Sequence, residues 1–139
     1  MSASADEVRW PVLRTRVSRP TDDLEAVAAF YRDGVGLPEL ARFIDHDGWD
    51  GVVFGLPGHG HQLEFSSHVD GSPCPAPSAE NVLVLALASR AACQDAVSRM
   101  RRLGHAPVEM ENPYWAVHHG VAFADPDGWR ILFLPPGGI

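Results

Sequence analysis

The chain has 139 residues, of which 45% are hydrophobic and 21% are charged, and its formal net charge at pH 7 is −7. These proportions are those of an ordinary globular domain and exclude a disordered chain. Because the negative charge repels phosphate groups, no nucleic-acid partner is expected. The first ten residues lack the apolar core of a signal peptide, and no stretch approaches the roughly 18 apolar residues of a membrane span. We therefore expect a cytoplasmic protein without a membrane partner.

The first half of the chain is typical of one strand, one helix and three further strands. The apolar, β-branched run 11–18 predicts a strand that stops at Pro20, because proline cannot continue the ladder of a central strand. Residues 21–37 carry a helical stripe of apolar side chains, with Thr21 or Asp22 as N-cap. Three shorter strands, separated by turn-forming residues, are predicted at 39–45, 50–56 and 61–67.

The second half repeats this order after a proline-rich connector at 68–80. A strand is predicted at 81–88 and a helix at 89–104, with Ser89 as its N-cap. Three arginines near the end of this helix are expected to complement its dipole: Arg99, Arg101 and Arg102. Strands at 106–110, 120–125 and 129–134 complete the unit, and a DPDG turn joins the last two as a hairpin.

The two halves are interpreted as copies of one unit. Their helices end at Gly36 and Gly104, an offset of 68 residues, and the same offset relates Glu64 to Leu132 in the last strand of each copy. Duplication of a mixed unit of this size predicts two sheets related by a pseudo-twofold axis, with helices on the outer faces. A concave space is therefore expected between the units.

Two segments resemble the vicinal oxygen chelate superfamily of glyoxalases, bleomycin-resistance proteins and extradiol dioxygenases. They are DLEAVAAFYRDGVGL (23–37) and GVAFADPDGWRILFL (120–134). The resemblance implies an α+β fold in which two βαβββ modules form a half-open barrel. A single domain over residues 1–139 is expected, with module one at about 12–67, the connector at 68–80 and module two at 81–134.

In the enzymes of this superfamily a divalent metal lies in the cavity and is held by one side chain from the first and last strand of each module. The matching positions here are Arg14 or Arg16, Glu64, Asn81 and Leu132. A guanidinium and a leucine cannot bind a cation, and asparagine is a weak ligand. The resemblance therefore predicts that the usual metal site is absent, and no cofactor is expected.

Glu64 is the candidate catalytic residue, because strand periodicity places it with Gln62 on the face that lines the predicted cavity. It is either a general base or an acceptor for ligand, or else a carboxylate in an ion pair with Arg14 or Arg16. Those arginines, with Arg130, are candidate ligand-binding residues for an anion, since guanidinium groups suit planar anions. The alternative is that they pair with acids of the protein.

Three aromatic residues, Trp49, Tyr114 and Trp115, are predicted in turns or loops beside the cavity mouth. One interpretation is that they stack on a flat ligand. The alternative is that they close the open edge of the barrel or are buried in a dimer contact. Asn81, at the start of the second unit, completes the set of candidate ligand-binding residues. His118 or His119 could join Glu64 in an unusual metal site, but solvated histidines are the preferred interpretation.

These observations predict a homodimeric small-molecule-binding protein that encloses an anionic or aromatic ligand without the usual metal. The alternative is a lyase, isomerase or dioxygenase of glyoxalase type, either metal-free with Glu64 as base or with a non-standard metal site. A regulatory module with a vestigial pocket is a third possibility. Whether the protein is an enzyme is left open by the sequence.

Overall fold

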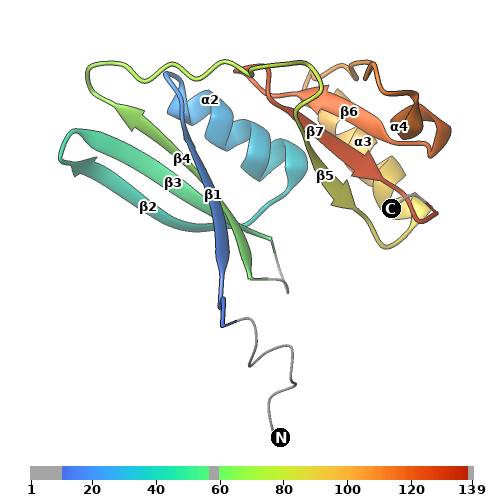
Figure 1. Ribbon diagram of the computed structural model, residues 1–139, viewed down its shortest axis with the longest axis horizontal. Coiled ribbons are helices and arrows are strands. Elements are labelled where there is room, and N and C mark those ends of the chain that lie inside the picture. Colours follow the sequence, from blue (N-terminus) through green and yellow to red (C-terminus); the bar gives the residue numbers. More distant parts are fainter. Residues whose placement is uncertain (1–10, 57–59, 138–139) are drawn as a thin grey trace, which may run out of the picture.

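The computed structural model describes residues 11–56 and 60–137. The histidine at position 59, predicted in a turn, lies outside the described residues. The first module contains a strand, a helix that changes to a π-helix, and three more strands (Figure 1). Their bounds are β1 Thr15–Pro20, α2 Leu24–Ala29, η1 Phe30–Val35, β2 Glu39–His46, β3 Trp49–Leu56 and β4 His61–His68.

The second module has the same plan with one strand fewer. Its elements are β5 Val82–Ala86, α3 Arg90–Arg102, α4 Pro113–Val117, β6 Val121–Ala124 and β7 Arg130–Leu134. The strand predicted at 106–110 is reduced to one isolated bridge between Val108 and Ala122. A short helix, α4, follows instead, because Pro113 opens it and the Asn112 side chain accepts a hydrogen bond from its first turn.

Each module forms its own sheet, and the two sheets have matching topology. The strand order is β1-β4-β3-β2 in the first sheet and β5-β7-β6 in the second. In both, the first strand of the module pairs in parallel with the last strand, β1 with β4 and β5 with β7. The internal duplication is thereby confirmed as a structural repeat, and Glu64 on β4 corresponds to Leu132 on β7. The α+β fold with two small sheets is as predicted.

Strand β1 starts later and ends later than predicted. It begins at Thr15, so Arg14 precedes the strand, and it runs through Arg19 to Pro20. Proline is accommodated because β1 is an edge strand, and none of the described strands pairs with its outer side. The extension of the strand to Pro20 affects the site, because it includes Arg19. Arg19 lies opposite Phe65 in the register and, like Val17, faces the helix side of the sheet.

The first helix also differs from the prediction in detail. Asp23, one residue beyond the predicted caps, accepts the hydrogen bond that starts α2. The helix then widens into η1, which ends at Gly36 in the left-handed conformation (φ 89°). Helix α3 begins at the predicted cap, Ser89, whose side chain accepts from the Ala92 N–H.

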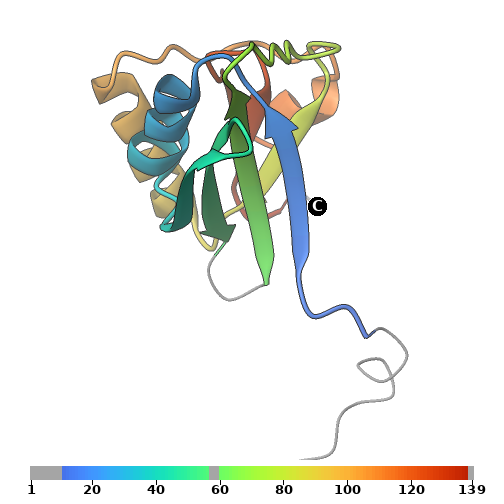
Figure 2. The same cartoon turned by 90° about the vertical axis from the view of Figure 1, so that its left-hand side faces the viewer.

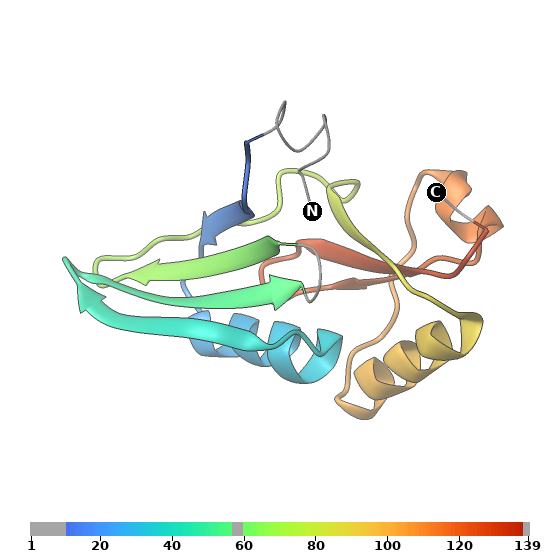
Figure 3. The ribbon, with the colours of Figure 1, turned by 90° about the horizontal axis from the view of Figure 1, so that it is seen from below.

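Helices α2 and α3 lie on one face of the two sheets, and α4 lies on the opposite face (Figures 2 and 3). On the helix face a single hydrophobic core runs across both modules; it includes Val27, Phe30, Phe54, Phe65, Met100, Phe123, Ile131 and Phe133. On the opposite face of the second sheet, a smaller cluster joins Trp115, Val108 and Met110 to Ala122, Leu132 and Leu134. Among the described residues, no helix has the length and apolar character that crossing a membrane requires.

Candidate functional site

A buried ionic network joins the two modules. Arg19 of β1 reaches the turn between β6 and β7, where its guanidinium donates to the carboxylates of Asp125 and Asp127, the latter at 2.8 Å. The side chain of Asp125 is 0% exposed and that of Arg19 is 11% exposed. The guanidinium also lies over the rings of Phe65 and Trp129, at 4.9 and 5.3 Å from their centroids. One cation from module one is thus held by groups of both modules.

The Asp125 carboxylate is fully hydrogen-bonded. One oxygen accepts from the backbone N–H groups of Asp127 and Trp129, which shapes the DPDG turn. The other accepts from Arg19 and, at 2.7 Å, from the Tyr31 hydroxyl. Burial first, and then the charge of Asp125, raises the pKa of Tyr31 well above its ordinary value. The hydroxyl therefore remains a donor at neutral pH.

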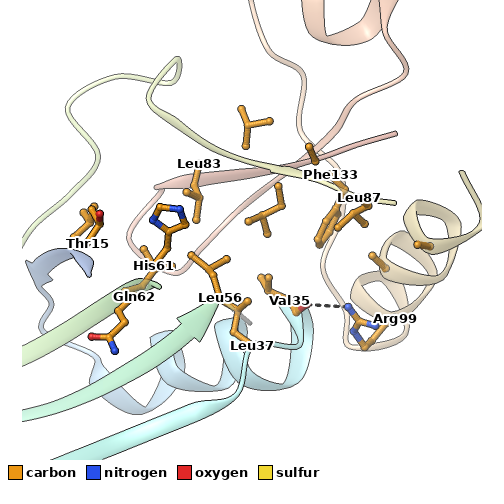
Figure 4. A pocket seen from close by; sticks show the side chains of 17 residues that line it. Thr15, Val35, Leu37, Leu56, His61, Gln62, Leu83, Leu87, Arg99 and Phe133 are labelled. Atoms are coloured by element: carbon orange, nitrogen blue, oxygen red, sulfur yellow. Dashed lines mark hydrogen bonds between the residues drawn. The ribbon is translucent and has the colours of Figure 1, made fainter. Parts of the chain in front are cut away.

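Two adjoining cavities lie along the seam between the modules, where β1 and β4 approach β5. The first, about 310 Å³, we call the charged cavity; it is lined by Arg19, Tyr31, Glu64, Asn81, Trp129 and Arg130, among others. The second, about 530 Å³, we call the aliphatic cavity; its lining includes Leu37, Leu56, Leu83, Leu85, Ala92 and Phe133 (Figure 4). Both volumes are in the range of small-molecule sites.

Glu64 is held in a polar cluster on the face of the first sheet that lies opposite α2 (Figure 3). Its Oε1 accepts from Arg16 at 3.1 Å and its Oε2 accepts from the Ser18 hydroxyl at 2.8 Å. Arg16 also donates to the Gln62 side chain at 2.9 Å. Strand register explains the grouping, since Arg16 lies opposite Gln62 and Ser18 opposite Glu64. Of the two predicted roles of Glu64, the ion pair with Arg16 is the one that these contacts favour.

Arg130 differs from Arg16 and Arg19 in the charge of its contacts. Its Nη1 donates to the Glu109 carbonyl at 2.6 Å and approaches the Met110 sulfur at 3.4 Å. Neither acceptor carries a net charge, whereas Arg16 and Arg19 are each bonded to carboxylates. Arg130 thus places a positive charge at the charged cavity, and its guanidinium can bind an anion there.

The structure brings only part of the predicted site together. Glu64, Asn81 and Arg130 line the charged cavity, and Gln62 lines the aliphatic one. Four predicted residues lie elsewhere. Arg14 is exposed ahead of β1, and Trp49 packs against His68 at the far end of the sheet. Trp115 covers the second sheet, and Tyr114 packs on Trp115 and His118. The last two belong to α4 and not to a loop at the cavity mouth.

The residues at the superfamily's metal positions do not fit a metal ion. Arg16 stands at the first position with its guanidinium bonded to Glu64. Leu132 is 0% exposed and packed in the cluster with Trp115. His119 lines a separate surface hollow with Cys93, away from Glu64. Within residues 11–56 and 60–137, no three metal-binding side chains of the His, Cys, Asp and Glu types converge.

Sequence reasoning missed most of the lining of the charged cavity, including Arg19, Tyr31 and Trp129. Tyr31 is also a core residue, since it is buried and stacks on Phe65 with ring centroids 4.6 Å apart. Arg19 is the next-to-last residue of β1. One signal in the sequence could have identified Arg19. Strand alternation places it on the face that packs against the helices, and a buried arginine needs an acidic partner. The DPDG turn offers two such acids.

Comparison with known proteins gives consistent matches over almost the whole chain. The model of the YycE-like N-terminal domain matches residues 15–66, and that of the YycE-like C-terminal domain matches residues 80–134. The uncharacterized protein YycE of Bacillus subtilis is 40% identical over 124 residues, which cover 89% of this chain and 88% of that protein.

Solved structures share the fold. A YycE protein of unknown function from Bacillus subtilis matches with a TM-score of 0.85 and 38% identity over 91% of this chain and 92% of the other. The trypanothione-dependent glyoxalase I of Leishmania major has a TM-score of 0.66 at 18% identity, over 86% and 84%. TnmS3, an antibiotic-binding protein from Streptomyces sp. CB03234, has 0.64 at 23%, over 89% and 95%. At these lower identities the likeness shows the fold alone.

Proposed function

Because the chain belongs to the YycE-like family, within the vicinal oxygen chelate superfamily, we propose that it binds a small molecule at the seam between its two modules. The proposed ligand is a small organic molecule with an anionic group. The charged cavity is its site. That a protein of this fold, TnmS3, binds an antibiotic supports a binding role.

The observation that carries this proposal is the position of Arg130. Arg130 lines the charged cavity, and its hydrogen bonds to the described residues are with neutral acceptors. Trp129 and Tyr31 line the same cavity, so a planar ligand would meet aromatic surface beside the guanidinium. An anion here would be neutralised by Arg130 without breaking the ion pairs of Arg16 or Arg19.

Glu64 is assigned a structural role in this proposal. Both of its carboxylate oxygens accept hydrogen bonds, from Arg16 and from Ser18. A general base must have a lone pair directed at the substrate proton, and both carboxylate oxygens of Glu64 are already engaged by donors of the protein. Binding without catalysis by Glu64 is therefore the function that the geometry supports best.

The test is a titration of the protein with benzoate and larger aromatic carboxylates, followed by isothermal calorimetry. Replacing Arg130 by Met should weaken binding by roughly tenfold to 100-fold, since a hydrogen bond to a charged group contributes about 1.5–3 kcal/mol. The matched control is Arg102→Met, at the exposed end of α3. Equal affinities in the two variants would contradict the assignment of Arg130, and the absence of binding by any organic acid, aromatic or aliphatic, would contradict the function.

We further infer that the protein is a homodimer, paired through the uncovered face of the first sheet. This face carries Arg16, Gln62 and Glu64, and beside them Leu40 and Phe43 lie over glycines of β3. Leu40 is 54% exposed. A second copy covering this face would bury apolar surface and close the cavities from one side.

A further inference from the structure

The charged and aliphatic cavities share one wall. Val17 of β1, Leu63 of β4 and Leu83 of β5 line both. On β1, Thr15 lines the aliphatic cavity and Arg19 the charged one, with Val17 between them. The two cavities are therefore consecutive parts of a single groove along the seam.

Strand β5 bounds the other side of this groove in the opposite order. Asn81, which precedes β5, and the residues up to Leu83 line the charged cavity, and the residues from Leu83 to Leu87, just beyond the strand, line the aliphatic one. The chemical character therefore changes along the groove. Charged and aromatic groups gather at one end, and the other end is mostly aliphatic.

The aliphatic end is formed by side chains of both modules that point toward one another (Figure 4). Leu37 and Leu56 come from module one, and Leu83, Leu87 and Phe133 come from module two. Val17, at the junction of the cavities, is 62% exposed although it lies on the helix face of its strand. A concave, mostly apolar lining of this kind is characteristic of a site for an apolar group.

The end of the aliphatic cavity is fixed by a contact between the modules. Arg99 of α3 donates to the carbonyls of Gly34 and Val35, at 2.7 and 2.9 Å, where η1 ends (Figure 4). Arg99 and Val35 both line the cavity. Since these bonds set the spacing between η1 and α3, the cavity has a defined shape and is not a variable gap between modules.

From this groove we propose that the ligand is an amphiphile: an acid whose anionic head lies at Arg130 and whose aliphatic tail lies in the aliphatic cavity. This inference rests on the proposed function, which places the anion in the charged cavity, and adds the class of ligand. A rigid aromatic acid would fill only the charged end. An acid with an alkyl tail uses the whole groove and covers Val17.

Chain length provides the test. Hexanoate, octanoate, decanoate and benzoate are titrated into the purified full-length chain by calorimetry. Each methylene buried in the aliphatic cavity should tighten binding about threefold to fourfold. Octanol, which has the tail of octanoate without its charge, should bind more weakly than octanoate by at least tenfold.

A matched pair of variants locates the tail. Ala92 lines the aliphatic cavity, and its neighbour Ala91 is exposed on the same turn of α3. Ala92→Phe should abolish the gain with chain length and leave benzoate affinity unchanged. Ala91→Phe should leave both unchanged, and the thermal midpoints of the two variants show that each is folded.

The outcomes separate this inference from the proposed function. Benzoate binding with no dependence on chain length overturns the amphiphile and leaves the aromatic-acid site in place. Equal affinity for octanol and octanoate overturns the placement of the head at Arg130. If no acid binds, the proposed function falls as well. A last outcome concerns protein concentration. If the gain in affinity with chain length disappears as the protein concentration rises, a second copy of the chain occupies the aliphatic cavity, and the inference is overturned.

Discussion

Asp125 receives hydrogen bonds from side chains of module one and from the backbone of its own turn. Arg19 and Tyr31 donate to one oxygen, while the N–H groups of Asp127 and Trp129 donate to the other. A fully buried carboxylate is tolerated because a cation and three further donors compensate its desolvation. The burial that isolates Asp125 also makes it sensitive to substitution, because water cannot replace a lost partner.

Asp125→Asn should therefore destabilise the fold strongly. The amide has one acceptor oxygen for donors on two sides, and Arg19 loses a buried counterion, which typically costs about 3–5 kcal/mol. The free energy of unfolding in urea measures the effect. Asp33→Asn is the control, since Asp33 pairs with Arg32 at the surface and such pairs contribute about 0–1 kcal/mol. Similar losses in the two variants would show that the Asp125 network contributes no more than a surface ion pair.

At the scale of elements, the π-helix η1 and the helix α3 depend on each other. The last carbonyls of a helix lack partners within it, and here those of Gly34 and Val35 accept from Arg99. The sequence predicted that Arg99 complements the dipole of its own helix. The structure shows its guanidinium at the C-terminal end of η1, where a positive charge has the same favourable effect on a different helix.

Arg99→Met should lower the free energy of unfolding by about 1–3 kcal/mol, because two half-buried carbonyls lose their donor. Arg102→Met, in the last turn of the same helix and exposed, should change it by less than about 0.5 kcal/mol. Hydrogen exchange of the η1 amides should accelerate in the first variant alone. If both variants lose equal stability, a dipole effect on α3 accounts for both arginines and the contact with η1 contributes nothing.

At the scale of the whole molecule, the two modules differ in what covers the corresponding faces of their sheets. In the second sheet, Trp115 with Val108 and Met110 covers the face that carries Leu132. In the first sheet the equivalent face carries Glu64, and no helix of the described residues covers it (Figure 3). Both modules therefore pair their first strand with their last, but the second sheet has one strand fewer and the two surfaces are covered differently. One face of the first sheet is left available to a second copy.

Light scattering during size-exclusion chromatography should give twice the mass of one chain. Leu40→Glu, on the uncovered face, should shift the protein to the monomer, because a buried carboxylate would lack a partner at the interface. Leu103→Glu is the control, since Leu103 is 50% exposed at the end of α3. A monomeric wild type at all concentrations, or a dimer that resists Leu40→Glu, would contradict pairing through this face.

The sequence by itself determined the features that depend on local periodicity and on turn residues. Alternation along β4 placed Gln62 and Glu64 on one face, and Ser89 marked the start of α3. The offset of 68 residues identified the duplicated unit and the correspondence of Glu64 with Leu132. These features are encoded within a few residues of each other, or in the repetition itself, so they can be read without knowing how the modules pack.

Only the tertiary structure decided which side chains meet across the seam. Arg19 binds Asp125, 106 residues later in the chain. Trp115 is a second example. The local pattern is equally consistent with a residue of the cavity and with a residue that covers Leu132, and the structure shows the second. Both contacts depend on the docking of one module against another or of α4 against its sheet. Local propensities do not constrain these distances, because they arise from the burial of surfaces that are far apart in sequence.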